Sequence, residues 1–221
     1  MQGFEADMYF NLSELDGRST YKLMTSTIVP RPIAWVVTLD REGRRNAAPF
    51  SFFGLLSGDP PLLCIGVGAR AGAAKDTGIN LREGGEFVVN LVSRNLLDAM
   101  NVTAIDFGPE VDELEMAGLR TEASVHVRPP RIADSPVAFE CRVEQVLNIA
   151  ANRWLILGVP LAAHIRDDAV LSAEKCYIDS GRLELVGRMR GGDGGGYSLQ
   201  DHLVELPALT RSQWEAGKGR R

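Results

Sequence analysis

The sequence predicts a mainly β fold, an antiparallel barrel with short helices between its strands. Residues 33–39 form a continuous run of apolar, β-branched and aromatic side chains, which is typical of a buried strand. Residues 137–149 alternate between apolar and polar side chains, as in a strand with one face in the core. No strand–helix–strand alternation is sustained along the chain, so a doubly wound parallel sheet is not expected.

Turn signals divide the first half of the chain. Residues 40–43 place Asp-Arg-Glu-Gly between two extended stretches, which predicts a long hairpin. Asp59-Pro60-Pro61 is incompatible with a helix, and Gly84-Gly85 ends one. The expected elements are strands at 33–39, 44–53, 62–67 and 86–92, and a short helix from Asp76 or Thr77 to residue 81 or 82.

The second half combines further strands with an acidic, loop-like segment. This segment, residues 107–118, is a candidate lid or dimer contact. The composition then shifts to glycine at residues 191–196. We therefore predict an N-terminal arm over 1–20, one barrel domain over 21–190, and a Gly-rich segment with a peripheral C-terminal tail over 191–221. The remaining expected elements are a helix at 95–104 and strands at 137–149, 154–159, 161–165 and 183–186.

Charge and cysteine usage exclude several classes of function. Lys and Arg total 24 and Asp and Glu total 29, so the net charge of -5 offers no global field to attract nucleic acid. The N-terminus does not resemble a signal peptide, and no apolar run approaches the roughly 20 residues of a membrane span. The three cysteines form no C-x-x-C pair, which disfavours a zinc site and suits a reducing compartment. We expect a cytoplasmic protein that binds neither nucleic acid nor membranes.

His126 and His164, two of the three histidines, do not predict a metal centre. Both lie in strand-like stretches, where an outward-facing polar residue is the simplest interpretation. They are far apart in the sequence, and no carboxylate cluster joins them at a ligand spacing. No metal site is therefore predicted.

The segment from Asn46 to Ser51 has the residue types that a flat ring system needs. Ala47 and Ala48 would let a ring lie against the strand, and Pro49 removes a backbone donor and bends the chain. The hydroxyl of Ser51 is able to donate to a phosphate oxygen. A kinked edge strand explains the same residues without any ligand, so the segment alone does not decide between the two.

The tripeptide Lys75-Asp76-Thr77 precedes a predicted helix and follows a loop of small residues. A helix N-terminus presents unpaired backbone N–H groups and a partial positive charge, which suits a phosphate. Lys75 adds a full positive charge and Thr77 a hydroxyl, while Asp76 is assigned to capping or to orienting Lys75. A capped helix start on the surface is the alternative.

Five segments taken together resemble a known family. They are Arg31-Pro32-Ile33-Ala34, Asn46-Ala47-Ala48-Pro49-Phe50-Ser51, Asp59-Pro60-Pro61, Lys75-Asp76-Thr77 and Glu86-Phe87-Val88-Val89-Asn90. Their order and spacing are similar to those of the flavin reductase-like, FMN-binding split-barrel family. This family includes flavoredoxin and the flavin reductase components of two-component monooxygenases. The resemblance runs from about residue 21 to 92, and more loosely to Tyr197.

The resemblance implies a six-stranded antiparallel Greek-key split barrel, a homodimer, and FMN rather than FAD near the subunit interface. It places Ser51, Lys75 and Thr77 at the phosphate. It places Arg31 near the flavin or its phosphate. The residues implied to line the isoalloxazine ring and ribityl chain are Thr38, Asn46, Ala47, Ala48 and Pro49. Arg188 and Tyr197 occupy the place of a late Gly-Arg and Tyr of the family, but the Gly-rich residues 190–196 depart from its pattern.

The implied activity is electron transfer from NADH or NADPH through bound FMN to free flavin, an oxygenase partner or another protein. Flavin supplies the redox chemistry in such proteins, and no side chain need act as acid or base in a hydride step. Catalytic residues therefore stay unassigned. No Gly-x-Gly-x-x-Gly opens a helix after a strand, so a Rossmann nicotinamide domain is not predicted. The alternatives are a flavoredoxin-like carrier without direct NAD(P)H use, a non-catalytic flavin-binding module, and an oxidase of the pyridoxamine-phosphate type, which the motifs favour less.

Overall fold

The structure, a computed structural model, describes residues 8–70, 72–190, 195–200, 204, 206 and 208–218. The helices are α1 (Gly17–Thr27), α2 (Asp76–Gly84), α3 (Leu97–Val102), α4 (Glu113–Met116) and α5 (Arg211–Lys218). The strands are β1 (Ala34–Leu39), β2 (Arg45–Phe50), β3 (Phe53–Gly58), β4 (Pro61–Val67), β5 (Glu86–Leu91), β6 (Thr121–Glu122), β7 (Arg131–Ile132), β8 (Val137–Ala150), β9 (Arg153–Ile165), β10 (Val170–Ser172), β11 (Tyr177–Ile178), β12 (Val186–Arg190) and β13 (Gly196–Leu199).

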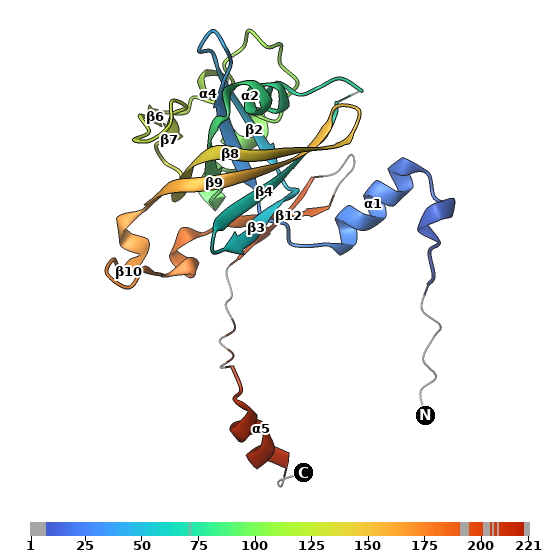
Figure 1. The fold of residues 1–221 in the computed structure, drawn as a ribbon, viewed down its shortest axis with the longest axis vertical. Helices are drawn as coiled ribbons and strands as arrows, with labels where there is room; N and C mark the ends of the chain where they lie inside the picture. Colours follow the sequence, from blue (N-terminus) through green and yellow to red (C-terminus); the bar gives the residue numbers. More distant parts are fainter. Residues whose placement is uncertain are drawn as a thin grey trace.

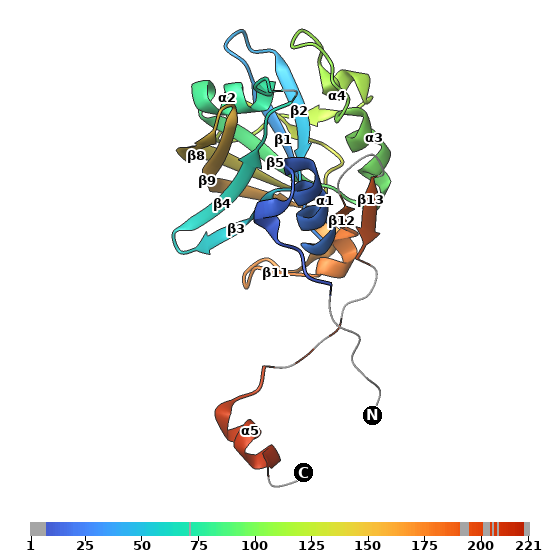
Figure 2. The same cartoon turned by 90° about the vertical axis from the view of Figure 1, so that its right-hand side faces the viewer.

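One antiparallel sheet forms the body of the molecule, with strand order β2-β1-β5-β8-β9-β4-β3 (Figures 1 and 2). Strands β2 and β3 stand at opposite ends of this order, yet only Ser51 and Phe52 join them. The sheet must therefore curl until its two ends are neighbours, which makes a barrel. After α2 the chain returns to place β5 beside β1, and this is a Greek-key connection.

The strand β1 is buried on both faces, which explains its unbroken apolar sequence. Ala34 and Val36 point into the barrel interior, where they join residues of β4, β5 and β9. Trp35 and Val37 point the other way, into a second core that α3, α4 and the segments around β7 cover. A strand with no solvent-facing side cannot show alternation, and it reads as a continuous hydrophobic run.

The predicted fold class is confirmed, but the main sheet has seven strands rather than six. The strand β3 was not predicted, because its residues lie between the extended stretch expected at 44–53 and the turn before residue 60. Its sequence Phe-Gly-Leu-Leu-Ser-Gly contains two glycines and shows no alternation. Leu55 and Leu56 both remain exposed on this strand, so no buried face marks it.

The strands predicted at 154–159 and 161–165 are one continuous strand, β9, and the division at Pro160 was wrong. Pairing between β4 and β9 ends with Leu63 opposite Gly158, whereas pairing with β8 continues to Ile165. From Val159 onward, β9 is therefore an edge on one side. A proline is tolerated there because no ladder bond on that side requires its missing N–H.

The elements near the two ends of the predicted barrel domain differ in detail from those expected. Helix α1 begins at Gly17, and its N-cap Asp16 accepts a hydrogen bond from the Ser19 N–H at 2.8 Å, a signal that the analysis overlooked. The strand predicted at 183–186 was placed too early, because a 3-10 turn spans Ser180–Leu183 and β12 follows it. Residues 1–7 and 191–194 lie outside the described residues, and the domain limits stay predictions.

The three cysteines differ in burial. Cys141 is fully buried in the barrel, and burial raises the pKa of its thiol to about 12. Cys64 is half-buried and Cys176 is exposed, and all three are free. Within the described residues no helix is long and apolar enough to cross a membrane.

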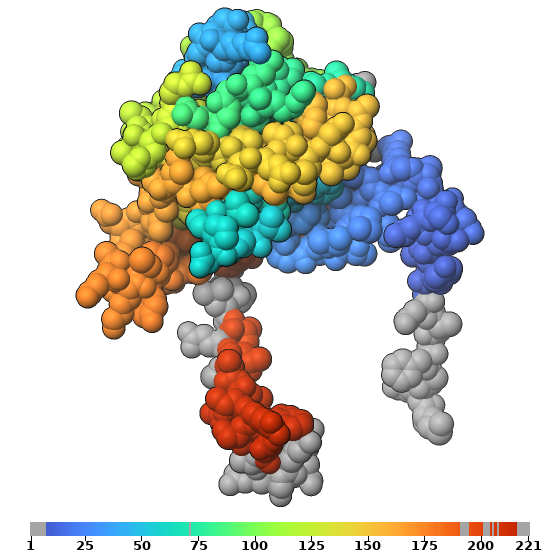
Figure 3. Space-filling model, viewed as in Figure 1, coloured from blue at the N-terminus to red at the C-terminus, as the bar shows by residue number. Residues whose placement is uncertain are grey.

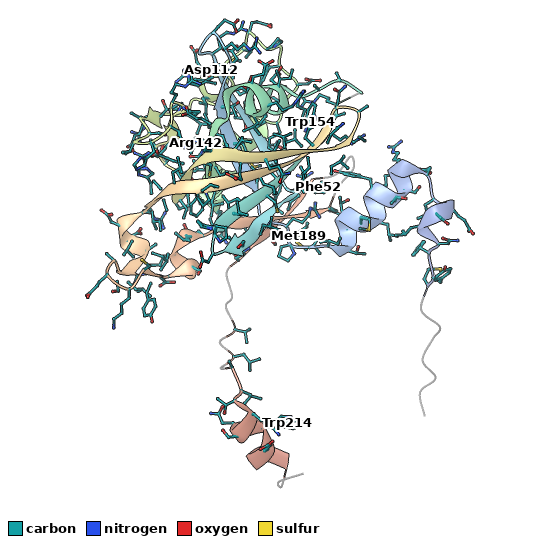
Figure 4. The ribbon with its side chains drawn as sticks, viewed as in Figure 1. Phe52, Asp112, Arg142, Trp154, Met189 and Trp214 are labelled. Atoms are coloured by element: carbon teal, nitrogen blue, oxygen red, sulfur yellow. The ribbon has the colours of Figure 1, made fainter. Side chains whose placement is uncertain are left out.

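Helix α2 packs closely on the barrel through Gly78. A Cβ atom at this position would lie 2.7 and 2.9 Å from ring carbons of Trp154, and 3.1 Å from Val67. Trp154, labelled in Figure 4, is buried and also lies beneath the Arg82 guanidinium, at 5.0 Å. Gly85, in the left-handed conformation, ends the helix as predicted.

We expect Gly78→Ala to destabilise the protein by roughly 1–3 kcal/mol, because the added methyl group overpacks the contact with Trp154. Urea unfolding measures the change. Gly17→Ala is the matched control, since this helical glycine has open space around it and alanine favours helices. A Gly78→Ala protein as stable as the control would contradict the close packing of α2.

Candidate functional site

A groove of about 360 Å³ opens between β2, the N-terminus of α2 and the segment that follows α3. Five of the nine predicted site residues line it, and the others lie elsewhere. The five are Asn46, Ala48, Pro49, Lys75 and Thr77. The remaining wall comes from the loop before α2 and from residues 103–107 and 113, which the sequence analysis did not assign to the site.

Beneath the groove lies a buried network of polar side chains that ties α2 to the hairpin β1–β2. The Thr77 hydroxyl donates to Asn46 Oδ1 at 2.7 Å. Thr38 Oγ1 accepts a bond from Asn80 Nδ2 at 3.0 Å and donates to Asn46 Oδ1 at 3.4 Å. Thr38 is fully buried and Thr77 almost so, because the hydrophobic layers close around them. Their hydroxyls thus hold α2 and β2 together beneath the groove.

Glu113 completes this network, and the sequence analysis missed it. Its Oε1 accepts from Asn46 Nδ2 at 2.9 Å, and its Oε2 accepts from the Ala47 N–H at 3.0 Å. Burial raises the pKa of this carboxyl, and the charge of Asp76 adds to the rise. The residue stands within a run of acidic side chains, 110–115, in which no spacing distinguishes it. Only the fold shows that Glu113 turns inward while Glu115 stays exposed.

Lys75 stands at the N-terminus of α2, where it is the N-cap residue and makes no side-chain capping bond. Its Nζ lies 5.1 Å from the centre of the Phe50 ring. Burial lowers the pKa of the Lys75 ammonium, and the nearby positive charge of Arg70 lowers it further. Arg70 itself forms an ion pair with Asp106 on the opposite wall. Lys75 and Arg70 thus face the groove together with the acids Asp76, Asp106 and Glu113. Lys75 and the helix start, which has no side-chain cap, are the part of the groove suited to an anion.

Arg31 and Ser51 lie together, but apart from the residues that line the groove. Arg31 Nε is 3.4 Å from Ser51 Oγ, and Arg31 Nη1 donates to the carbonyl of Ile28 at 3.0 Å and to that of Thr25. Arg31 is buried and therefore anchors the end of α1 against the corner between β2 and β3. Neither residue lines the groove in this chain.

Ala47, Arg188 and Tyr197 have structural contacts of their own. The Ala47 side chain is fully buried in the outer core. Arg188 and Tyr197 are register partners in β12 and β13, and the guanidinium lies 4.7 Å from the Tyr197 ring centre. The Arg188 backbone also exchanges hydrogen bonds with that of Arg31.

His164 does not simply face outward as expected. Its Nε2 lies 2.6 Å from Oε1 of Glu140, whose side chain is fully buried. Burial opposes the charge of Glu140, but bonds from the Val125 and His126 N–H groups and from His164 outweigh it, so the pKa is lowered. His126 lies in a bend rather than a strand. No group of potential metal ligands gathers within the described residues.

The groove suits a ligand that combines a flat ring with an anionic end. Ala48, Pro49, Ala73 and Ala74 form a wall with little bulk, against which a ring can lie. The helix start and Lys75 provide backbone N–H groups and a positive charge at one side of the same groove. A flavin mononucleotide has both of these parts, so the residues present fit it.

A comparison with protein families decides the relationship. The model of the "Flavin reductase like domain" matches residues 24–181. The chain belongs to the flavin reductase-like family. The chain is also similar to a protein of Deinococcus radiodurans, with 43% identity over 212 residues, which are 94% of this chain and 92% of the relative.

Solved structures place this flavin reductase-like protein among split barrels. Component B of nitrilotriacetate monooxygenase from Bacillus cereus has a TM-score of 0.84 and 30% identity, covering 92% of this chain and 100% of its own. The 2-nitrobenzoate 2-nitroreductase of Pseudomonas fluorescens has a TM-score of 0.83 and 31% identity, covering 92% and 98%. A split-barrel protein of Shewanella frigidimarina, at 22% identity, TM-score 0.78 and coverage of 92% and 100%, supports the fold. Together with the family match, these neighbours support a flavin-related redox function.

The wall of the groove at Thr103 is fixed by a buried hydrogen bond. Trp35 Nε1 donates to Thr103 Oγ1 at 2.9 Å, and both side chains are buried. We expect Thr103→Val to cost roughly 1–3 kcal/mol of unfolding free energy, because the indole N–H loses its partner. Urea unfolding again gives the value. Thr27→Val, which removes an exposed hydroxyl bonded only within α1, is the control, and equal losses in both variants would refute the assignment.

Proposed function

We propose that this flavin reductase-like protein binds FMN non-covalently and passes electrons from NADH or NADPH to an acceptor. One observation carries the proposal. The uncapped start of α2, with Lys75, opens into the same groove as the low wall of Ala48 and Pro49. One ligand could thus place a phosphate at the start of α2 and a planar ring against Ala48 and Pro49. Flavin, when bound, supplies the redox chemistry.

Lys75 and the first N–H groups of α2 would hold the phosphate. Thr77 contributes less directly, since its hydroxyl hydrogen is committed to Asn46 and its side chain is almost buried. Ala48, Pro49 and the Asn46 side chain would line the ring and the ribityl chain. Thr38 and Ala47, which are buried beneath this surface, would hold it in place. Ser51 and Arg31 would contact the flavin or its phosphate from the corner at the end of β2. FAD is less favoured because the binding features on which the proposal rests match a single phosphate and a ring.

An absorbance spectrum of the purified protein, before and after addition of FMN and gel filtration, tests cofactor binding. We expect flavin bands that remain with the protein. Anaerobic mixing with NADH and with NADPH then tests the donor. Rapid bleaching supports a reductase, whereas bleaching with dithionite alone would favour a flavoredoxin-like carrier. Absence of flavin binding would leave a non-catalytic module of another kind.

We expect Lys75→Ala to weaken FMN binding about tenfold while changing riboflavin binding little, because a charge-assisted bond to the phosphate is lost. Titration of intrinsic flavin fluorescence measures both affinities. Lys175→Ala, at an exposed position in the turn between β10 and β11, is the control. Equal weakening of FMN and riboflavin by Lys75→Ala would refute the phosphate assignment.

The acceptor is proposed from the neighbours. One of them is a monooxygenase component, and another is named for the reduction of a nitro compound. An oxygenase partner, free flavin or another electron-accepting protein would each fit a reductase whose groove is open to the surface. We favour transfer to a partner oxygenase or to free flavin.

We further propose that the protein is a homodimer. An apolar surface spans α1 and β3, where Tyr21 and Phe52 meet with ring centres 6.3 Å apart. Figure 3 displays α1 and the β3–β4 hairpin on one face of the molecule, and Figure 4 marks Phe52 on the side of the barrel toward α1. Large contiguous apolar patches are uncommon on monomers. The exposed residues of this surface are Tyr21, Met24, Ile28, Phe52, Leu55 and Leu56.

We expect Leu55→Glu to shift the protein from dimer to monomer, since Leu55 is 73% exposed in the single chain and a buried charge would oppose association. Sedimentation velocity distinguishes the two states. Leu171→Glu on β10, where Leu171 is 63% exposed, is the control and should leave the dimer intact. A wild-type protein that sedimented as a monomer would refute the proposal.

A further inference from the structure

The carboxylate of Glu113 is a buried acid that the proposed electron transfer does not use. Its side chain belongs to α4, whereas its bonds reach Asn46 and Ala47 on β2. The residue is only 6% exposed, yet it borders the groove of about 360 Å³. It also borders a second cavity of about 260 Å³ on the other side of Asn46. Glu113, Asn46 and Asp76 form the partition between these two spaces.

Glu113 imposes a direction on the hydrogen bonds of the groove. An ionised carboxylate only accepts hydrogen bonds, so the Asn46 Nδ2 must face it. The Asn46 Oδ1 then faces Thr77 and Thr38, and it accepts from their hydroxyls. Every donor in this series of bonds therefore points toward the carboxylate. If the Asn46 amide turned over, its oxygen would face the Glu113 carboxylate oxygen, and the Thr77 and Thr38 hydroxyls would have to accept from it instead of donating to it.

The surroundings of Glu113 give it few other partners. Asp76 on α2 repels it, and the ion pair between Arg45 and Asp112 lies beside it with Arg45 Nη2 2.5 Å from Asp112 Oδ2. Figure 4 marks Asp112 beside α4. Arg45 is thus occupied by another acid. Two donors on β2 hold the Glu113 carboxylate in place: the Asn46 side-chain Nδ2 and the Ala47 backbone N–H.

We propose that Glu113 is a positioning residue, which fixes the orientation of the Asn46 amide in the flavin groove. This inference rests on the proposed function, because it takes the groove to be the flavin site. Without Glu113, the Asn46 amide would have two nearly equivalent orientations. Helix α4 therefore selects one of them, which the strands alone do not. The acidic segment before β6 therefore helps to shape the site instead of serving only as a cover.

An exchange of chemical groups tests the proposal. Glu113→Gln alone places an amide N–H against the donors of Asn46 or Ala47, and Asn46→Asp alone places two carboxylates together. The double variant Asn46→Asp/Glu113→Gln restores a donor and an acceptor that face each other between α4 and β2. In it the new amide on α4 donates to the new carboxylate on β2, which still accepts from the Thr77 hydroxyl. The total charge is that of the wild-type protein. Glu115→Gln, at an exposed position on the same helix, is the control.

FMN affinity, the absorbance bands of bound FMN and the thermal unfolding of the flavin-free protein are measured for all five proteins. We expect each single variant to bind FMN about tenfold more weakly, with shifted bands, because a buried polar group is left without a partner. The double variant should return to within about threefold of the wild-type affinity and recover its bands. The control should match the wild type.

Two results would overturn the inference. Wild-type affinity and unshifted bands in both single variants would mean that the amide orientation is irrelevant to the ligand, even if the variants were less stable. A double variant no better than the sum of the single changes would mean that Glu113 does not act through Asn46. A wild-type protein that bound no FMN would instead overturn the proposed function, and this inference with it.

Discussion

The two-residue connection between β2 and β3 is the constraint on which the rest of the structure depends. Ser51 and Phe52 are too few to cross a flat sheet, so the strands at its two ends must be neighbours. The closed sheet gives the barrel its interior core. It also brings β2 beside the start of α2, where the groove forms. Arg31 secures this corner through Ser51 and fixes the end of α1 there.

Hydrophobic burial and polar bonding have separate roles around the groove. The two apolar cores lie on either side of β1 and hold the strands rigidly. The polar network lies between β2 and α2, beside these cores. Its side chains form hydrogen bonds with one another instead of with bulk solvent. Such a fully bonded cluster specifies one arrangement, because a half-satisfied alternative costs more than it gains. The surface that faces a ligand is therefore set by side chains that scarcely reach it.

Local signals predicted most of the framework. The hairpin β1–β2, the buried strands and the helix after Lys75 all follow from turn residues, apolar runs and a terminal glycine pair. The errors fell where tertiary context decides. Pro160 remains within a strand because one neighbour ends before it, and β3 has no buried face to give it a pattern.

The site was predictable in part for the same reason. Lys75, Thr77 and the small residues of β2 lie in short motifs, and the family resemblance of these motifs predicted that they share a site; five of the predicted residues line one groove. Glu113 is distant in the chain and is one of several acidic residues in its segment. Only the packing of α4 on β2 selects it. Ser51 and Arg31 lie at the corner instead of in the groove, since β2 ends at Phe50 and the chain bends at Ser51, beside the end of α1.

The burial of β1 on both faces has a consequence for local unfolding of the protein. Each core on its own would be an independent layer that could open while the other stayed closed. Because β1 contributes side chains to both, neither layer can come apart without exposing the other. The barrel and the helical cover over its outer face therefore behave as a single cooperative unit, and the amide hydrogens of β1 exchange with solvent only when the whole unit opens.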